Sequence, residues 1–202
     1  MERFTAQDMT IIHYTLGTAP ERSGGLTHYS TDLIAEQQRS ATVVLLYAQG
    51  WQWHNRDISW RRVGKRGGIE CYALQNSLPL PLRYGVHDPA DFISTKSMSQ
   101  SAMESLYNEI KPDAFHVHTL MGLPKELLIF FKSKGVKLVY TAHDYYGICP
   151  KVNMIDHNGE VCNTPSPQKC RECNRASKST LFLRLYNSKI GLLLKNYVKA
   201  RL

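Results

Sequence analysis

The segment MTIIHYTLGTAPERSGGLTHYSTDLIAEQQRSATVVLLYAQG, residues 9–50, decides the fold class. It opens with a short apolar run that ends near Gly17, followed by a glycine-containing loop. The next stretch has the spacing of one helical face, with apolar side chains at Leu26, Tyr29, Leu33 and Ile34. The run ATVVLLYAQG then reads as a second buried strand. A strand, a helix and a strand in this order predict a right-handed crossover between parallel strands.

The alternation of strands and helices continues along the chain. We expect strands at residues 69–74, 113–118 and 136–142 and helices at residues 91–111 and 124–135. The fold class that follows is α/β, with a Rossmann-like parallel sheet that carries helices on both faces. In such sheets ligands bind beyond the carboxyl ends of the strands, so the loops at these ends are the candidate sites.

Composition restricts the class of protein. A chain of 202 residues with 43% hydrophobic and 21% charged content suits a folded domain with a sizeable core. No apolar run reaches the roughly 18 residues that a membrane span requires. The N-terminus lacks the basic-then-apolar pattern of a signal peptide. We therefore expect a cytoplasmic protein.

The net charge of +8 is concentrated at the C-terminus, because residues 174–202 contain seven basic residues and no acidic one. We predict one amphipathic helix over residues 179–202. Its apolar stripe consists of Phe182, Tyr186, Ile190, Leu193 and Tyr197. Such a helix is typical of binding to an anionic membrane surface, here through residues 181–202 on the inner face of the membrane. Packing on its own domain, or on an additional one, is an equally good interpretation.

Residues 51–66, WQWHNRDISWRRVGKR, are rich in tryptophan and in basic side chains. Single-stranded nucleic acid can bind to such a combination. An exposed loop whose tryptophans pack onto the fold is the more common arrangement. We therefore interpret the segment as a loop and do not expect a nucleic-acid partner.

Three loops at predicted strand ends carry polar candidates. Gly24 and Gly25 precede a helix, where free N–H groups and the helix dipole favour a phosphate, although a simple glycine turn explains them equally well. His116 and His118 alternate on a strand and share a face, but no third metal ligand is close in sequence. His143 ends the last predicted strand, and the adjacent Asp144 either orients it or caps the next turn. The position of His143 favours a functional role.

Four of the five cysteines cluster in residues 149–173. They are Cys149, Cys162, Cys170 and Cys173, with the spacing C-x12-C-x7-C-x2-C. The final C-x-x-C suits tetrahedral zinc, and a structural metal would order a loop that has few apolar residues. Separate reduced thiols are almost as well supported, and redox or iron–sulfur chemistry is less so. Zinc is therefore preferred only narrowly over separate reduced thiols.

The chain resembles the N-terminal domain of family-four, GT-B-type retaining glycosyltransferases. The matching segments are GGLTHYSTDLIAEQ, KPDAFHVHTLMGLP, GVKLVYTAHDYYGICP and the trailing C…CREC, in family order from Ile11 to Cys173. The resemblance implies one half of a GT-B architecture. Residues 1–173 would form the Rossmann-like domain, including the cysteine loop 149–173. Residues 174–202 would add its basic helix.

The resemblance also implies roles for particular residues. Gly24 and Gly25 would approach the diphosphate of a nucleotide-sugar donor, and His143 would contact the donor sugar. His118 would lie on the side of a glycan or lipid-linked acceptor, as in polysaccharide biosynthesis. The family usually needs no metal for its chemistry, so zinc at the cysteines would be structural.

The family's donor-binding C-terminal domain, with its E-x7-E motif, is not present in these residues. The strand that normally follows the basic helix is not present either. Catalysis depends on groups that hold the departing phosphate. We therefore expect the isolated chain to be inactive, whether it is a truncated product, an excised domain or half of a split enzyme. A non-catalytic module that binds a partner subunit or a membrane is the alternative function.

Overall fold

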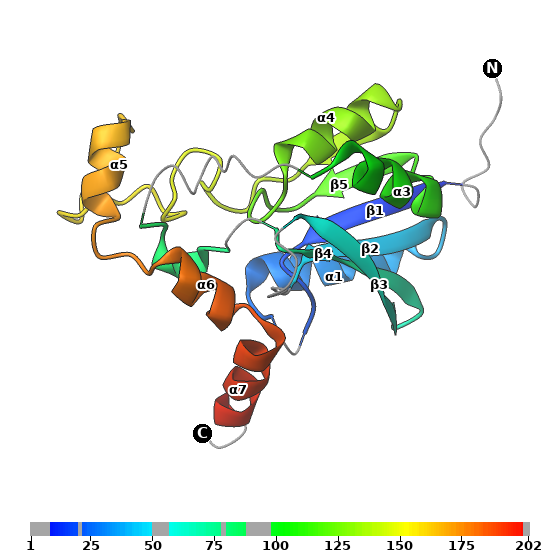
Figure 1. Ribbon diagram of the computed structural model, residues 1–202, viewed down its shortest axis with the longest axis horizontal. Coiled ribbons are helices and arrows are strands. Elements are labelled where there is room, and N and C mark those ends of the chain that lie inside the picture. Colours follow the sequence, from blue (N-terminus) through cyan, green and yellow to red (C-terminus); the bar gives the residue numbers. More distant parts are fainter. Residues whose placement is uncertain (1–8, 20–21, 50–56, 78–79, 88–97, 200–202) are drawn as a thin grey trace.

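The structure is a computed structural model that describes residues 9–19, 22–49, 57–77, 80–87 and 98–199. Its centre is a six-stranded sheet in the order β3-β4-β2-β1-β5-β6 (Figure 1). The strands are β1 (Thr10–Thr15), β2 (Thr42–Ala48), β3 (Ser59–Arg66), β4 (Ile69–Gln75), β5 (Ala114–Val117) and β6 (Lys137–Tyr140). Neighbouring strands are parallel except for the antiparallel pair β3–β4.

Helices cover both faces of the sheet, which confirms the predicted α/β fold class. The helices are α1 (Gly25–Gln37), the short 3-10 helix η2 (Leu82–Tyr84), α3 (Gln100–Ile110), α4 (Lys125–Ser133), α5 (Pro167–Cys173), α6 (Thr180–Tyr186) and α7 (Lys189–Lys199). Side chains of a strand alternate between faces. Along β2, Val43 and Leu45 pack with Ile34 of α1, whereas Val44 and Leu46 join the cluster that contains α3 and α4.

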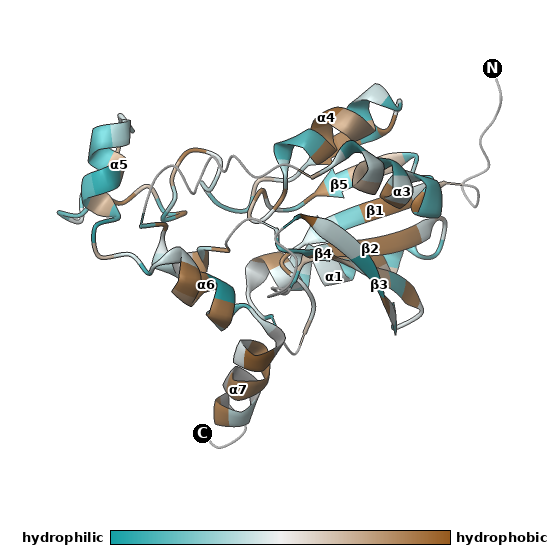
Figure 2. Cartoon of the chain, viewed as in Figure 1, coloured by the Kyte–Doolittle hydropathy of each residue, from teal (hydrophilic) through white to brown (hydrophobic). Residues whose placement is uncertain are grey.

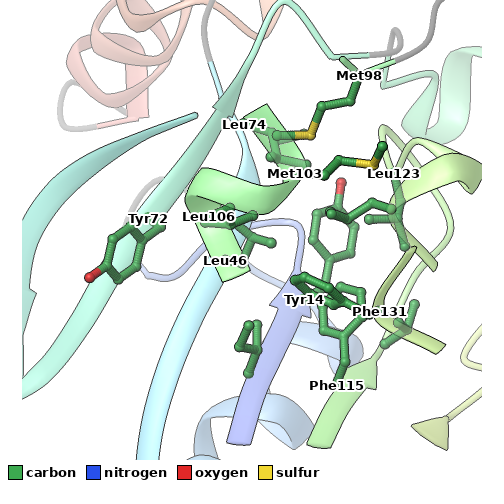
Figure 3. Packing of buried hydrophobic residues seen from close by; sticks show 14 of the residues in the cluster. Tyr14, Leu46, Tyr72, Leu74, Met98, Met103, Leu106, Phe115, Leu123 and Phe131 are labelled. Atoms are coloured by element: carbon green, nitrogen blue, oxygen red, sulfur yellow. The ribbon is translucent and has the colours of Figure 1, made fainter. Parts of the chain in front are cut away.

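The larger core lies on the α3 and α4 face. Phe115 of β5 and Phe131 of α4 meet edge to face with ring centroids 5.0 Å apart (Figure 3). Tyr14 is fully buried beside them, and its hydroxyl donates a hydrogen bond of 2.7 Å to the Met121 carbonyl. This bond ties the loop after β5 to the centre of the sheet.

The prediction of a loop over residues 51–66 is wrong for residues 59–66, which form β3; residues 51–56 lie outside the described ranges. Two glycines with positive φ, Gly67 and Gly68, make the two-residue turn between β3 and β4. Glu70 of β4 pairs with Arg62 at 2.7 Å and with Lys65 at 3.3 Å. These cross-strand pairs connect β3 to β4, while the side chains of Arg62 and Lys65 stay largely exposed.

Two other predicted elements change at their limits. The helix predicted over residues 91–111 begins at Gln100 within the described residues, because the Ser99 hydroxyl accepts a hydrogen bond from the Ala102 N–H and caps it; residues 91–97 are outside the description. The strand predicted over residues 136–142 is shorter in the structure and spans Lys137–Tyr140. It is the outermost strand β6, and all four of its residues are exposed.

The single helix predicted over residues 179–202 is two helices, α6 and α7, and residues 200–202 are outside the description. Asn187 ends α6: its amide group donates to the carbonyls of Leu183 at 2.7 Å and Leu80 at 3.1 Å. The Ser188 hydroxyl then accepts the Gly191 N–H at 3.2 Å and starts α7. Side-chain capping therefore divides a continuous apolar stripe into two helices that point in different directions (Figure 1).

Within the described ranges, none of the helices is long and apolar enough to cross a membrane.

Candidate functional site

Histidines from three neighbouring strands meet near the carboxyl edge of the sheet. His13 lies in β1 and His116 lies in β5. His118 comes directly after the last residue of β5, and His143 follows β6. The parallel register places His13 directly beside His116. His13 and His118 stack with ring centroids 5.2 Å apart, and His116 and His118 stack at 4.2 Å. The structure thus brings the predicted site residues His118 and His143 together.

A chain of hydrogen bonds runs from the interior to this edge. His13 Nε2 lies 2.7 Å from Gln37 Oε1, and His13 Nδ1 lies 2.9 Å from His118 Nε2. His118 Nδ1 lies 3.4 Å from His143 Nε2. Because an amide oxygen only accepts, His13 Nε2–H must donate to Gln37, so His118 Nε2–H donates to His13 and His143 Nε2–H to His118. This order leaves His143 Nδ1 as a hydrogen-bond acceptor.

Burial keeps the inner histidines neutral. It lowers the pKa of His13 to about 4, against the opposing effect of the Gln37 hydrogen bond. Burial, and then the nearby His116, lowers the pKa of His118 to about 3. Both rings are therefore uncharged at neutral pH. Each ring donates one hydrogen bond and accepts another within the chain of hydrogen bonds.

His143 is half-buried, and its neighbour Asp144 has a capping role. The Asp144 carboxylate accepts the Tyr146 N–H at 2.9 Å, so it caps the turn that follows β6. Of the two roles that the sequence left open for Asp144, the structure shows capping. Burial lowers the pKa of His143, and the charge of Asp144 opposes this shift.

Tyr29 connects the predicted phosphate loop with the histidines. Its ring contacts His143 edge to face at 4.9 Å and His118 at 5.9 Å. Tyr29 lies in the second turn of α1, which begins at Gly25, and Gly24 precedes the helix with φ of 125°. Gly24 has no side-chain cap, and a Cβ added to it would have no described atom within 4 Å, so the start of the helix is open.

A pair of arginines near the same loop was missed by the sequence reasoning. Arg22 and Arg66 line a pocket with Gly17 and Thr18 at the ends of β1 and β2. Arg22 Nε donates to the Leu16 carbonyl at 3.2 Å, and Arg66 donates to the Thr18 hydroxyl at 2.8 Å. The interpretation of residues 51–66 as a loop hid Arg66, which β3 carries to this pocket. Two guanidinium groups make the pocket suitable for an anion.

A third metal-ligating group joins His116 and His118. Their ring nitrogens and one of His13 all lie within 4.8 Å of one another. The sequence argued against a metal here because no third ligand was close in sequence, but β1 supplies His13 as a third nitrogen from a distant part of the chain. In the structure His13 Nδ1 and His118 Nε2 lie 2.9 Å apart and share a hydrogen bond.

The four clustered cysteines lie apart from the histidines. Cys149, Cys162, Cys170 and Cys173 all border one pocket, and all four are free thiols. Cys71 is elsewhere, buried under α1 in the smaller core cluster.

No protein-family model and no curated protein matches the sequence. Among solved structures, the chain is similar to the catalytic domain of starch synthase IV from Arabidopsis thaliana bound to ADP and acarbose. The identity is 17% and the TM-score 0.41, over 68% of this chain and 34% of that one. The chain thus spans about a third of the length of that structure, and a likeness at this level carries no argument about the site.

Proposed function

We propose that the chain is the N-terminal, acceptor-side domain of a glycosyltransferase. It would help to move a sugar from a nucleotide-sugar to a polysaccharide or glycolipid acceptor. One observation carries the proposal: His118, His143 and the open start of α1 meet at one edge of the sheet, connected by Tyr29. From the resemblance of the sequence to family-four glycosyltransferases, we expect the acceptor near His118, the donor sugar at His143 and the donor phosphate at the start of α1.

The histidine chain suits the handling of a sugar hydroxyl. Gln37, His13 and His118 fix the tautomer of His143, so that His143 Nδ1 can accept a hydrogen bond from a hydroxyl of the donor or acceptor. A neutral, oriented imidazole binds such a group without introducing a charge beside the reacting carbon. His143 is the catalytic residue of this proposal, and His118 and His13 are positioning residues.

The departing diphosphate requires positive charge and N–H donors. The bond between the sugar carbon and the phosphate oxygen breaks, and the diphosphate carries away the electron pair. The acceptor hydroxyl oxygen bonds to the sugar carbon, and its proton passes to the departing phosphate oxygen. The N–H groups near Gly24 and Gly25 and the arginines Arg22 and Arg66 would stabilise this charge on one side. A C-terminal domain or partner subunit would hold the nucleotide on the other side, so the isolated chain is expected to be inactive.

Replacing His143 with alanine is expected to reduce sugar transfer by about 100-fold, because a positioned hydrogen-bonding group contributes roughly that factor. The chain is combined with a separately expressed E-x7-E domain from the same genome, and transfer from a panel of labelled nucleotide-sugars is measured. His28→Ala is the control, because His28 is an exposed histidine of α1. Absence of transfer from every donor, or equal rates for both variants, would contradict the proposal.

Binding to an anionic membrane is the second candidate function, and the surface of α7 favours it. Much of α7 is hydrophobic (Figure 2). The apolar side chains of Ile190, Leu193 and Leu194 are each more than 60% exposed. The segment that contains them is basic and has no acidic residue. A helix with these two properties can lie in a membrane interface and hold the protein on the inner face of the membrane.

The triple variant Ile190→Ser, Leu193→Ser, Leu194→Ser is expected to lose flotation with vesicles that contain anionic lipid. Each apolar side chain contributes about 1.5–3 kcal/mol when it is fully buried, so the loss of affinity for three of them should be about 1,000-fold or more. The control is Ile129→Ser with Val161→Ser, two residues of similar exposure outside α7. Equal flotation of all three proteins, or no flotation of the wild type, would exclude this function.

A further inference from the structure

The segment between Cys149 and Asn174 has an ordered path that its apolar contacts do not explain. None of the side chains of α5 is buried, and Ile148 and Val161 are more than half exposed. Val152 and Met154 nevertheless adopt φ values of 64° and 55°. For a β-branched residue such as Val152 this left-handed conformation is unfavourable. The turn is held by backbone hydrogen bonds from the Val152 N–H to the Cys149 carbonyl at 2.9 Å and from the Tyr145 N–H to the Val152 carbonyl at 3.2 Å.

Four thiols from separate parts of this segment converge on one pocket. Cys149 ends the turn after β6, where its N–H donates to the Tyr145 carbonyl at 2.7 Å. Cys162 follows the Ile155–Val161 bridge, and Cys170 and Cys173 are one helical turn apart in α5. These cysteines come from a turn, an antiparallel bridge and a helix, so a bond to each would fix all three relative to one another.

We infer that Cys149, Cys162, Cys170 and Cys173 bind one structural Zn²⁺ ion as a tetrahedral set of four thiolates. Four sulfur ligands in a closed set are the usual donors of a structural zinc site. In the described part of the chain the sulfurs are not as tightly grouped as the three histidine nitrogens, so ion binding would draw them inward. Metal binding of this kind is coupled to ordering of the surrounding chain.

The surroundings of the thiols suit a negatively charged metal centre. Four thiolates on Zn²⁺ leave a net negative charge, and Lys151 and Lys169 border the same pocket. His157 Nδ1 lies 3.8 Å from Cys173 Sγ, where an N–H can donate to a metal-bound thiolate.

The zinc ion would stabilise two connections of the domain. The turn between His143 and Cys149 is anchored by Tyr146, which is 4% exposed. After α5, the Asn174 side chain is 1% exposed and accepts the Val86 N–H at 3.2 Å. The ion would join these anchored ends and so keep the turn that carries His143 in position. This role does not depend on sugar transfer.

Elemental analysis of the purified full chain is expected to give about one zinc ion per chain. Cobalt substitution should produce the intense thiolate-to-cobalt charge-transfer absorption that imidazole ligands do not give. Cys170→Ser should lose the metal and become sensitive to protease within residues 149–173. Cys71→Ser should keep the metal, since Cys71 is buried in another cluster.

Wild-type protein provides a test that needs no variant. Removal of zinc by a chelator should expose residues 149–173 to protease, and added Zn²⁺ but not Mg²⁺ should restore protection. The inference would be overturned if the purified protein contained no metal and Cys170→Ser left its protease sensitivity unchanged. It would also be overturned if the protein contained iron in place of zinc. A third contrary result would be zinc that is lost in His118→Asn but retained in Cys170→Ser. The last result would place the ion at the histidines.

Discussion

Replacing Gly122 with alanine is expected to lower the free energy of unfolding by about 2–5 kcal/mol. Gly122 has φ of 75°, a left-handed conformation that an L side chain adopts at a cost. An added Cβ would lie 2.7 Å from Ala48 Cβ and 2.7 Å from Leu80 Cδ2. It would also lie 3.1 Å from the hydroxyl of Tyr14, which is fixed by its hydrogen bond to Met121. The backbone must therefore move, or the core around Tyr14 must repack.

Gly135→Ala separates the two contributions to this loss. Gly135 has a similar φ of 81°, but a Cβ added there would have no described atom within 4 Å. Its substitution should cost only the conformational part, about 1–2 kcal/mol. Urea unfolding of both variants, with the m-value checked for constancy, measures the difference. Equal losses in the two variants would show that the loop after β5 is not in close contact with the core.

The central strands could be predicted because their signal is local. The apolar runs of β1 and β2 report burial directly. Of the predicted apolar face of α1, in contrast, only Ile34 is buried, and Tyr29 is exposed. The edge strand β3 has half-exposed residues and several cations, so its own sequence resembles a loop. Its stability comes from a partner, through Glu70 of β4 and through the packing of Trp60 on Tyr72. The paired glycines before Ile69 were the sequence signal for the hairpin that was overlooked.

The break between α6 and α7 shows a different limit. An apolar stripe at helical spacing runs through residues 182–197, so periodicity alone predicts one helix. Asn187 interrupts it by bonding to Leu80, a residue 107 positions away, while Arg22 donates to the Asn187 side-chain oxygen at 2.8 Å. These contacts are tertiary and leave no periodic signal. The dipeptide Asn187–Ser188 was the available indication, because both residue types favour helix ends.

The candidate site was predictable where it lies at strand ends. His118 and His143 could be proposed because the carboxyl ends of parallel strands form ligand sites. His13 could not, because it lies within a strand and reads as a core residue. Its role depends on the register between β1 and β5, which places it beside His116 across about 100 residues of sequence. Gln37, at the end of α1, depends on the same packing.

Acidification from pH 6.5 toward pH 4 is expected to destabilise the protein steeply because of His13 and His118. The folded-state pKa of each is far below the ordinary value of 6.5, at about 4 and about 3. Below pH 6.5 the unfolded chain therefore binds protons that the folded chain excludes. The stability that the neutral rings provide is complete above pH 6.5 and is lost as the pH falls. Each ring contributes a slope of at most about 1.4 kcal/mol per pH unit.

Replacing His118 with asparagine is expected to remove one such contribution. The variant loses the stack on His13 and the hydrogen bond of 2.9 Å, so it should be less stable at pH 7. Its stability should nevertheless fall less steeply with acid, by about 1.4 kcal/mol per pH unit at most. Urea unfolding at several pH values between 7 and 4.5 measures both slopes, with His28→Asn as the control at an exposed position.

The slope of stability against pH distinguishes a buried titrating group from a group that is only structural. Any disruptive substitution lowers the stability at pH 7, whereas only the loss of a group that stays neutral in the folded protein flattens the acid limb. Carboxylates contribute to the same limb mainly below about pH 5, and they contribute equally in the wild type, in His118→Asn and in His28→Asn. If His118→Asn and the wild type have parallel slopes between pH 6.5 and 5, His118 takes up a proton in the folded state. The chain of neutral hydrogen bonds from Gln37 to His143 would then be wrong, and with it the tautomer assigned to His143.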